Sequence, residues 1–225
     1  MLRGVNLTVE QGETMVILGG SGTGKSVLLK HMNGLIDPDS GDVFVDGLAI
    51  SHLGEDELRE VRKKVAMVFQ GSALFDSLTV AENVAYPLYE HAALSLDGLR
   101  DRVEEVLSLV DMERDGGLYP AEISGGMKKR AALARALALS PRCLLYDEPT
   151  TGLDPVMTQR INRLIRDVQR KLGVTSVVVT HDIESAFAVA DRLAFLQEGQ
   201  IRFVGTREET KATSDLALHE FLHGV

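Results

Sequence analysis

The segment GGSGTGKS at residues 19–26 constrains the fold of this chain more than any other feature. It follows TMVIL, which predicts a buried strand over 14–18, and it opens a helical pattern from about Lys25 to Leu35. The segment fits G-x-x-x-x-G-K-[ST] in the strand–loop–helix context that a phosphate loop needs, and a chance glycine-rich turn is the alternative. The residues predicted to contact a nucleotide here are Gly19, Gly20, Ser21, Gly22, Thr23, Gly24, Lys25, Ser26 and Val27.

The residue types of this loop suit phosphate. Glycines let the backbone pass close to the ligand with its N–H groups turned inward, and the helix N-terminus adds a partial positive charge. We expect Lys25 to reach the β- and γ-phosphates and Ser26 to hold Mg²⁺. The loop therefore predicts a nucleoside triphosphate bound together with magnesium.

Two carboxylates follow a second apolar run. Asp147 and Glu148 come directly after CLLY (143–146), and ligands in such sheets sit at the strand ends. We expect Asp147 to bind magnesium, through water, and Glu148 to polarise the attacking water as general base. Adjacent acids that cap the next helix or face solvent are the alternative.

Two more polar residues end apolar runs. Gln70 ends KVAMVFQ (64–70), where its amide can orient water or a metal ion; an exposed strand-end glutamine is the alternative. His181 follows SVVVT and can donate a hydrogen bond to the γ-phosphate; a purely structural histidine is the alternative. The predicted catalytic residues are Lys25, Gln70, Glu148 and His181, and the predicted metal-binding residues are Ser26, Gln70 and Asp147.

A second glycine turn, ISGGM, lies at residues 123–127 and runs into helix-forming residues. Ser124, Gly125 and Gly126 stand where the N–H groups of a helix N-terminus have no partner within the helix, which favours an anion. One chain therefore carries two phosphate-binding turns that lie far apart in the sequence.

The order of the patterns predicts an α/β fold. The runs CLLYDEP (143–149) and SVVVTHD (176–182) do not alternate, which is typical of a parallel sheet covered on both faces. Hairpins are expected over 40–50, turning at Asp46-Gly47, and over 192–205, turning at Glu198-Gly199. Residues 79–82 match a capping box, with Pro87 closing that helix, and an amphipathic helix follows from Asp97. We expect a single domain over 1–225, with a core of 1–70 and about 141–225 and a helical insertion at about 71–140.

The composition limits the function. The net charge of −9 argues against nucleic acid as the main partner, because there is no basic excess to neutralise a phosphate backbone; a local basic patch is the alternative. Cys143 is the single cysteine, so no intrachain disulfide can form, and we interpret it as a small core residue. No apolar stretch approaches the roughly 20 residues that span a bilayer, so membrane attachment has to come through a partner.

Taken in order and spacing, GGSGTGKS, Gln70, ISGGM, LLYDEP, TGLD (151–154) and His181 resemble the nucleotide-binding subunits of ABC transporters over nearly the whole chain. The resemblance implies an α/β P-loop NTPase (RecA-like) core sheet with an inserted α-helical subdomain that carries the signature motif. It implies ATP and Mg²⁺ as cofactors, hydrolysis in a head-to-tail homodimer, and integral membrane permease subunits that the helical insertion contacts at the cytoplasmic face of the inner membrane. Ser124, Gly125 and Gly126 then face the nucleotide of the other copy, and Asp154 links the two sites.

Some segments resemble one branch of that family. Met127 stands where most members carry glutamine, and this SGGM form, with residues 71–88 and the tail ALHEFLHGV, resembles the ATPases of MCE-type systems, including the Mla phospholipid transporters. The resemblance implies phospholipid transport and a periplasmic MCE-type lipid-binding partner. A neutral helix residue is the alternative for Met127. Members usually carry a first strand and an adenine-stacking aromatic residue before LRGVNL, and this sequence begins after that segment. A misassigned start, a truncated form and another way of holding adenine are the alternatives, and we expect weaker ATP affinity for this form.

Three functions remain open from the sequence. The chain is a motor for lipid transport, a motor for another cargo such as a small-molecule import substrate, or a non-transport ABC ATPase that acts on DNA or ribosomes. The third class usually carries large insertions, zinc-binding cysteines or tandem ATPase domains, whereas this chain has one cysteine and one set of motifs.

Overall fold

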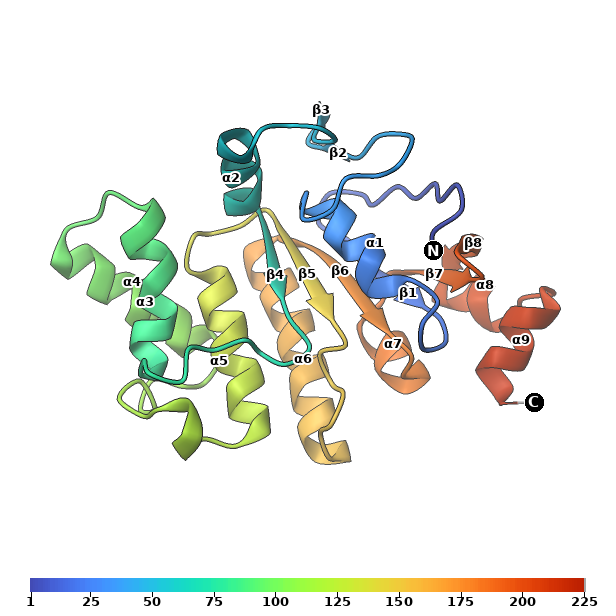
Figure 1. Cartoon of the computed structure of the whole chain (residues 1–225). Helices are drawn as coiled ribbons and strands as arrows, with labels where there is room; N and C mark the ends of the chain where they lie inside the picture. Colours follow the sequence, from blue (N-terminus) through green and yellow to red (C-terminus); the bar gives the residue numbers. More distant parts are fainter. Residues whose placement is uncertain (225) are drawn as a thin grey trace.

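A six-stranded sheet forms the centre of the computed structural model, which describes residues 1–224 (Figure 1). The strand order is β4-β5-β6-β1-β7-β8; the first five run parallel and β8 is antiparallel to β7. The predicted parallel sheet is therefore confirmed. The strands are β1 (Thr14–Leu18), β4 (Val65–Val68), β5 (Cys143–Asp147), β6 (Thr175–Thr180), β7 (Arg192–Gln197) and β8 (Gln200–Thr206).

Helices cover both faces of the sheet, which explains why its inner strands are apolar throughout. One face packs on α1 (Lys25–Met32), on α2 (Glu55–Lys64) and on residues of the hairpin formed by β2 (Phe44–Val45) and β3 (Leu48–Ala49). Helix α2 was not predicted from the sequence. The other face packs on α5 (Gly125–Leu137), α6 (Pro155–Leu172) and α7 (Ile183–Val189). Each face has its own apolar core, and β1 contributes Met15 and Ile17 to one and Val16 and Leu18 to the other.

Helices α3 (Val80–His91), α4 (Leu96–Leu109) and α5 pack on one another at one end of the sheet, with the short 3₁₀ turn η1 (Pro120–Glu122) before α5 (Figure 1). Their buried apolar residues join the core on the α5–α6 side of the sheet. This is the segment that the sequence predicted to be helical. The division of the chain into a core and a subdomain remains a prediction.

Pro87 does not end its helix. The capping box is present, since the Thr79 hydroxyl accepts from the Glu82 amide at 3.2 Å, but α3 continues past Pro87 to His91. A proline inside a helix removes one backbone hydrogen bond and crowds the preceding turn. Val84 and Leu88, on either side of it, are almost fully buried, and this apolar packing offsets the loss.

Several predicted ends differ from the observed ones. The helix predicted to reach Leu35 ends at Met32, where the chain turns through Gly34 at φ 66°. Strand β4 ends at Val68, so Gln70 lies two residues beyond the strand instead of ending it. Glu148 and His181 are the first residues after β5 and β6. The two predicted hairpins are confirmed at their turns.

The chain ends in α8 (Arg207–Lys211) and α9 (Leu216–His223), with the Phe195 and Phe221 rings 5.3 Å apart. Val225, the last residue of the tail ALHEFLHGV, lies outside the described residues. Across residues 1–224, no helix combines the length and the apolar character needed to cross a membrane.

Candidate nucleotide site

The glycine loop follows β1 and enters α1, as the motif requires. Gly24 stands directly before α1 at φ 106°, a conformation that favours glycine. Gly19 has a different need for glycine, because a Cβ there would lie 2.4 Å from the carbonyl oxygen of Leu196. The Thr23 hydroxyl donates to the Gly20 carbonyl at 2.9 Å and closes the loop, and Val27 lies in the first turn of α1.

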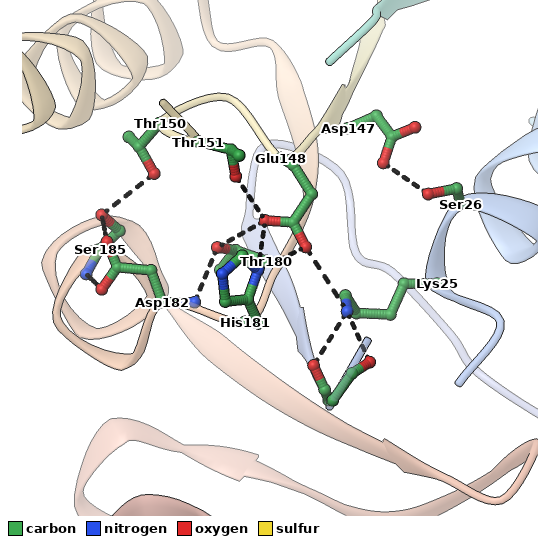
Figure 2. A network of polar contacts seen from close by, with 12 residues as sticks. Lys25, Ser26, Asp147, Glu148, Thr150, Thr151, Thr180, His181, Asp182 and Ser185 are labelled. Atoms are coloured by element: carbon green, nitrogen blue, oxygen red, sulfur yellow. Dashed lines mark hydrogen bonds and ion pairs between the residues drawn. The ribbon is translucent and has the colours of Figure 1, made fainter. Parts of the chain in front are cut away.

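Lys25 is buried inside this loop. Its Nζ donates to the carbonyl oxygens of Gly19 and Gly20 at 2.9 Å each and lies 3.5 Å from Oε1 of Glu148 (Figure 2). Only 6% of Lys25 is exposed. The ammonium group therefore lies between the phosphate loop and the carboxylate that follows β5. A terminal phosphate of a bound nucleotide can be contacted there by the ammonium group and lie near the carboxylate.

Ser26 and Asp147 meet across the site. The Ser26 hydroxyl, at the start of α1, donates to Oδ1 of Asp147 at 2.7 Å (Figure 2). A hydroxyl and a carboxylate are the oxygen donors that Mg²⁺ prefers, together with water and phosphate oxygens. The donor pair fits the predicted magnesium ion, although no cluster of three or more His, Cys, Asp or Glu side chains suited to a metal occurs within residues 1–224. Such an ion depends on phosphate and water for its remaining ligands.

Glu148 is held by three donors from two segments. Its carboxylate accepts from the Thr151 hydroxyl at 3.2 Å, from the Thr180 hydroxyl at 3.3 Å and from His181 Nδ1 at 3.0 Å (Figure 2). Its backbone has φ 47°, and its amide donates to the Val179 carbonyl at 3.0 Å. A non-glycine residue at positive φ is uncommon and is typical of functional sites. The carboxylate is thus held in one direction by the ends of β5 and β6.

A second polar network supports the His181 side of the site. The Ser185 hydroxyl donates to Asp182 at 2.7 Å and lies 3.4 Å from the Thr150 hydroxyl (Figure 2). It also accepts from the Asn162 amide at 2.9 Å. These contacts join the turn after β5 and helix α6 to the first turn of α7. The residue next to His181 is therefore anchored, while the His181 ring itself is half-exposed.

Gln70 is not joined to the predicted metal ligands. Its side chain is exposed, and among the described residues no hydrogen bond links its amide to Ser26 or Asp147. Its backbone carbonyl instead accepts from Nζ of Lys129, a buried lysine on α5. The same ammonium lies 3.5 Å from the carbonyl oxygen of Glu148. Burial lowers the pKa of Lys129, and the charges of Asp147 and Glu148 oppose that shift.

The second glycine turn forms the start of α5. Ser124 caps the helix, with its hydroxyl accepting from the Met127 amide at 3.3 Å. Within the described chain, the amides of Gly125 and Gly126 have no backbone or side-chain acceptor, as expected for the first turn of a helix. Gly126 packs against Met157 of α6, whose methyl group fills the space of a Cβ, whereas Ser124 and Gly125 are exposed.

Asp154 caps α6. Its Oδ1 accepts from the amides of Val156 and Met157 at 2.9 and 3.0 Å, and its side chain is exposed. A contact between Asp154 and a second copy remains a prediction. Cys143 packs against the core and burial raises the pKa of its thiol to about 12, which agrees with the interpretation of a structural cysteine.

Three residues for which no role was predicted contact this site: Thr151, which opens the TGLD motif, Thr180 and Lys129. Thr180 carries a usable signal, because a hydroxyl at the end of a buried parallel strand lies at the edge where ligands bind. Lys129 carries no such signal, since it lies within the basic run KKR and only packing shows that it is buried while Lys128 is partly exposed.

Comparison with known proteins agrees with this geometry. The family model described as "ABC transporter" matches residues 2–151. Methionine import ATP-binding protein MetN 2 of Rhodococcus jostii is 50% identical over 202 residues, which are 90% of this chain and 59% of that protein. The intermembrane phospholipid transport system ATP-binding protein MlaF of Haemophilus influenzae is 40% identical over 220 residues, which are 98% of this chain and 83% of that protein.

A solved structure matches as well. The ATP-binding cassette MJ0796, solved as a dimer in a post-hydrolysis state bound to ADP and Pi, has a TM-score of 0.83 and 37% identity, covering 91% of this chain and 90% of that one. The match extends over sheet and helices together, and the family model spans the segment from the phosphate loop to Glu148. The chain therefore belongs to the ABC transporter family and has the fold of its ATP-binding domain.

Proposed function

We propose that this chain binds Mg-ATP between two copies of itself, hydrolyses it, and thereby drives transport through a separate membrane permease. The observation that carries the proposal is the position of the Glu148 carboxylate. It lies 3.5 Å from Lys25 and accepts from His181, directly after the strand whose last residue, Asp147, binds the Ser26 hydroxyl. A base, a phosphate-binding cation and a metal-binding pair thus share one strand edge.

In this proposal each residue has one task. The amides of residues 19–27 and the ammonium of Lys25 bind the phosphates, and His181 donates to the γ-phosphate. Ser26, Asp147 and Gln70 hold the magnesium ion, which neutralises charge on the phosphate oxygens when bound. Glu148 orients a water molecule and takes its proton. Gln70 has to turn its exposed amide inward for this role, which its place beyond the end of β4 permits.

The second copy completes the site. Ser124, Gly125 and Gly126 offer unpaired amides at an exposed helix N-terminus, which suits the γ-phosphate of a nucleotide held by the other copy. Asp154 lies at the neighbouring N-terminus of α6 and is exposed for contact across the same boundary. The dimer of MJ0796 supports a homodimer as the working form.

An exposed aromatic cluster supports the permease as partner. The Phe75 and Tyr86 rings lie 4.8 Å apart, and Tyr89, 62% exposed, is one turn further along α3. Exposed aromatic residues of this kind mark protein contacts. The cluster belongs to the region between Gln70 and α5, so a permease there can influence the site. We propose a peripheral position at the cytoplasmic face of the inner membrane, with no nucleic-acid partner.

The cargo we propose is phospholipid, with an MCE-type lipid-binding protein as a further periplasmic partner. The SGGM signature and the match to MlaF, which extends over 83% of that protein, support it. Methionine is the second candidate, because MetN 2 has the higher identity of 50%. The chain covers only 59% of the length of that methionine relative.

Reconstitution tests the function and separates the cargoes. The chain is coexpressed with the membrane proteins encoded beside it, and the purified complex is placed in phospholipid vesicles with Mg-ATP. We expect phosphate release that rises with fluorescent phospholipid and transfer of that lipid between vesicles. Stimulation by methionine with its binding protein, and none by lipid, supports the second candidate. A complex that releases no phosphate contradicts the motor itself.

A further inference from the structure

Lys129 is a buried cation that has no role in the mechanism proposed above. It lies one turn into α5, which we call the signature helix, after residues 124–126, the signature turn. Only 8% of Lys129 is exposed. Within residues 1–224, no carboxylate lies within ion-pair distance of its ammonium group. A buried charge is tolerated only when it is hydrogen-bonded, so its acceptors indicate what it is for.

Both acceptors are backbone carbonyls of proposed site residues. The ammonium donates to the Gln70 carbonyl, beyond the end of β4, and lies 3.5 Å from the Glu148 carbonyl, beyond the end of β5. One side chain on the signature helix therefore joins the two turns that carry the proposed water-orienting amide and the proposed base. The Glu148 turn needs such support, because its φ of 47° is unfavourable for a glutamate.

Other basic residues of α5 bind carbonyls elsewhere. Arg135 donates to the carbonyls of Ser72 and Ala73 at 2.9 and 2.7 Å, so it holds the segment after Gln70 without touching Glu148. Arg130 donates to the carbonyls of Val110 and Asp111 at 3.0 and 2.6 Å, at the end of α4 and away from the site. Only Lys129, among these three, links α5 to the backbone of the base.

We propose that Lys129 is a positioning residue that holds the backbones of Gln70 and Glu148 in register with the signature helix. When α5 shifts against the sheet, this ammonium transmits the shift to both turns, so the position of the signature turn and the alignment of the base change together. The inference rests on the proposed ATP hydrolysis and concerns turnover more than nucleotide binding, because Lys129 does not contact the phosphate loop.

The test compares two basic residues of one helix. Lys129→Met removes the donor and keeps the length of the side chain. Arg130→Met removes a neighbouring side chain of α5 that makes two comparable contacts, with the carbonyls that follow α4. Phosphate release gives kcat and KM for Mg-ATP, and circular dichroism gives the melting temperature. We expect kcat of Lys129→Met to fall about ten- to a hundred-fold, as for a misaligned reacting group, with KM changed about two-fold or less. Lys129→Arg, which restores a cation with several donors, recovers part of kcat.

Arg130→Met is expected to lower the melting temperature and to keep the wild-type kcat per folded molecule. The proposal is overturned if Lys129→Met keeps the wild-type kcat, or if Arg130→Met loses as much kcat as Lys129→Met. If Lys129→Met does not fold, Lys129→Gln takes its place; its side chain is shorter and uncharged, so an undiminished kcat there also overturns the proposal. A wild-type chain that binds but never hydrolyses Mg-ATP contradicts the proposed function instead.

Discussion

The two turns that are predicted to bind phosphate differ in what surrounds them. The loop at residues 19–26 meets residues from β5, β6 and the turns after them, and its Lys25 and the facing Glu148 are both more than nine-tenths buried. The turn at residues 124–126 is one exposed helix N-terminus backed by Met157. The first is surrounded by a carboxylate, a cation and a hydroxyl–carboxylate pair, whereas the second has only amides.

This difference separates chemistry from binding. A reaction needs groups fixed relative to one another, and the many donors to Glu148 supply that rigidity. A turn with unpaired amides can bind an anion but cannot activate water. We infer that the groups around the loop at residues 19–26 carry out the hydrolysis. The turn at residues 124–126 contributes to the reaction only when it belongs to a second copy that is bound.

Glu148→Gln should have the largest effect. The amide keeps the size of the side chain but cannot take a proton, so we expect kcat to fall about 10²- to 10⁴-fold while Mg-ATP still binds. The trapped nucleotide should hold two copies together, which size-exclusion chromatography with Mg-ATP can detect. The matched control is Glu184→Gln, an exposed acid three residues beyond His181, which should retain wild-type turnover. An active Glu148→Gln enzyme contradicts the role of the base.

Mixing two inactive variants tests whether the halves belong to different copies. Ser124→Arg fills the signature turn and Lys25→Ala removes the phosphate-binding cation, and each alone should lose about 10²-fold in kcat, as for loss of a charge-stabilising donor. A heterodimer of the two keeps one undamaged pair of turns. We therefore expect an equimolar mixture to regain about a quarter of the wild-type rate if copies pair at random in a closed dimer.

The control for this mixture is dilution. A composite site requires dimers, so the wild-type rate per chain should fall as the protein is diluted below its dimerisation constant. If the mixture stays inactive while the rate per chain is constant at every dilution, each copy works alone and the comparison drawn above is wrong.

Local features could be predicted from the sequence because neighbours in the chain determine them. The loop at residues 19–26, the cap at Thr79, the hairpin turns and the signature turn each depend on a few consecutive residues, and each is present. The parallel sheet was predictable as well, since apolar runs without alternation suit only strands covered on both faces.

Features that depend on distant packing could not be predicted. Pro87 lies inside α3 because Val84 and Leu88 are buried against other helices, which no local rule for proline includes. The burial of Lys129 depends on how α5 lies against the turns after β4 and β5. The outward direction of the Gln70 side chain depends likewise on β4 ending two residues earlier than the apolar pattern indicates.

The smallest expected effect concerns residues 75–83, the linking segment, which lies in the sequence between the loop at residues 19–26 and the turn at residues 124–126. Asn83 of α3 is fully buried; its amide group accepts from the Phe75 amide at 2.8 Å and donates to the carbonyls of Phe75, Leu78 and Thr79 at 3.0–3.1 Å. Asn83→Ala leaves the Phe75 amide and the Leu78 carbonyl without a partner among the described residues, while the Phe75 and Thr79 carbonyls keep their backbone donors. We therefore expect the free energy of unfolding to fall by about 1–3 kcal/mol. Urea denaturation measures it.

Thr79→Ala is the matched control on the same turn, because it removes only an exposed cap worth about 1 kcal/mol. Asn83 holds the linking segment and does not touch the phosphate loop, so the affinity of Asn83→Ala for Mg-ATP should remain that of the wild type. Stimulation of hydrolysis by the reconstituted permease should weaken, because the aromatic cluster on this segment is the proposed contact. If the affinity for ATP falls and the stimulation by the permease does not, the linking segment supports the loop at residues 19–26. The contrast between this loop and the turn at residues 124–126 is then smaller than the difference in their neighbouring residues indicates.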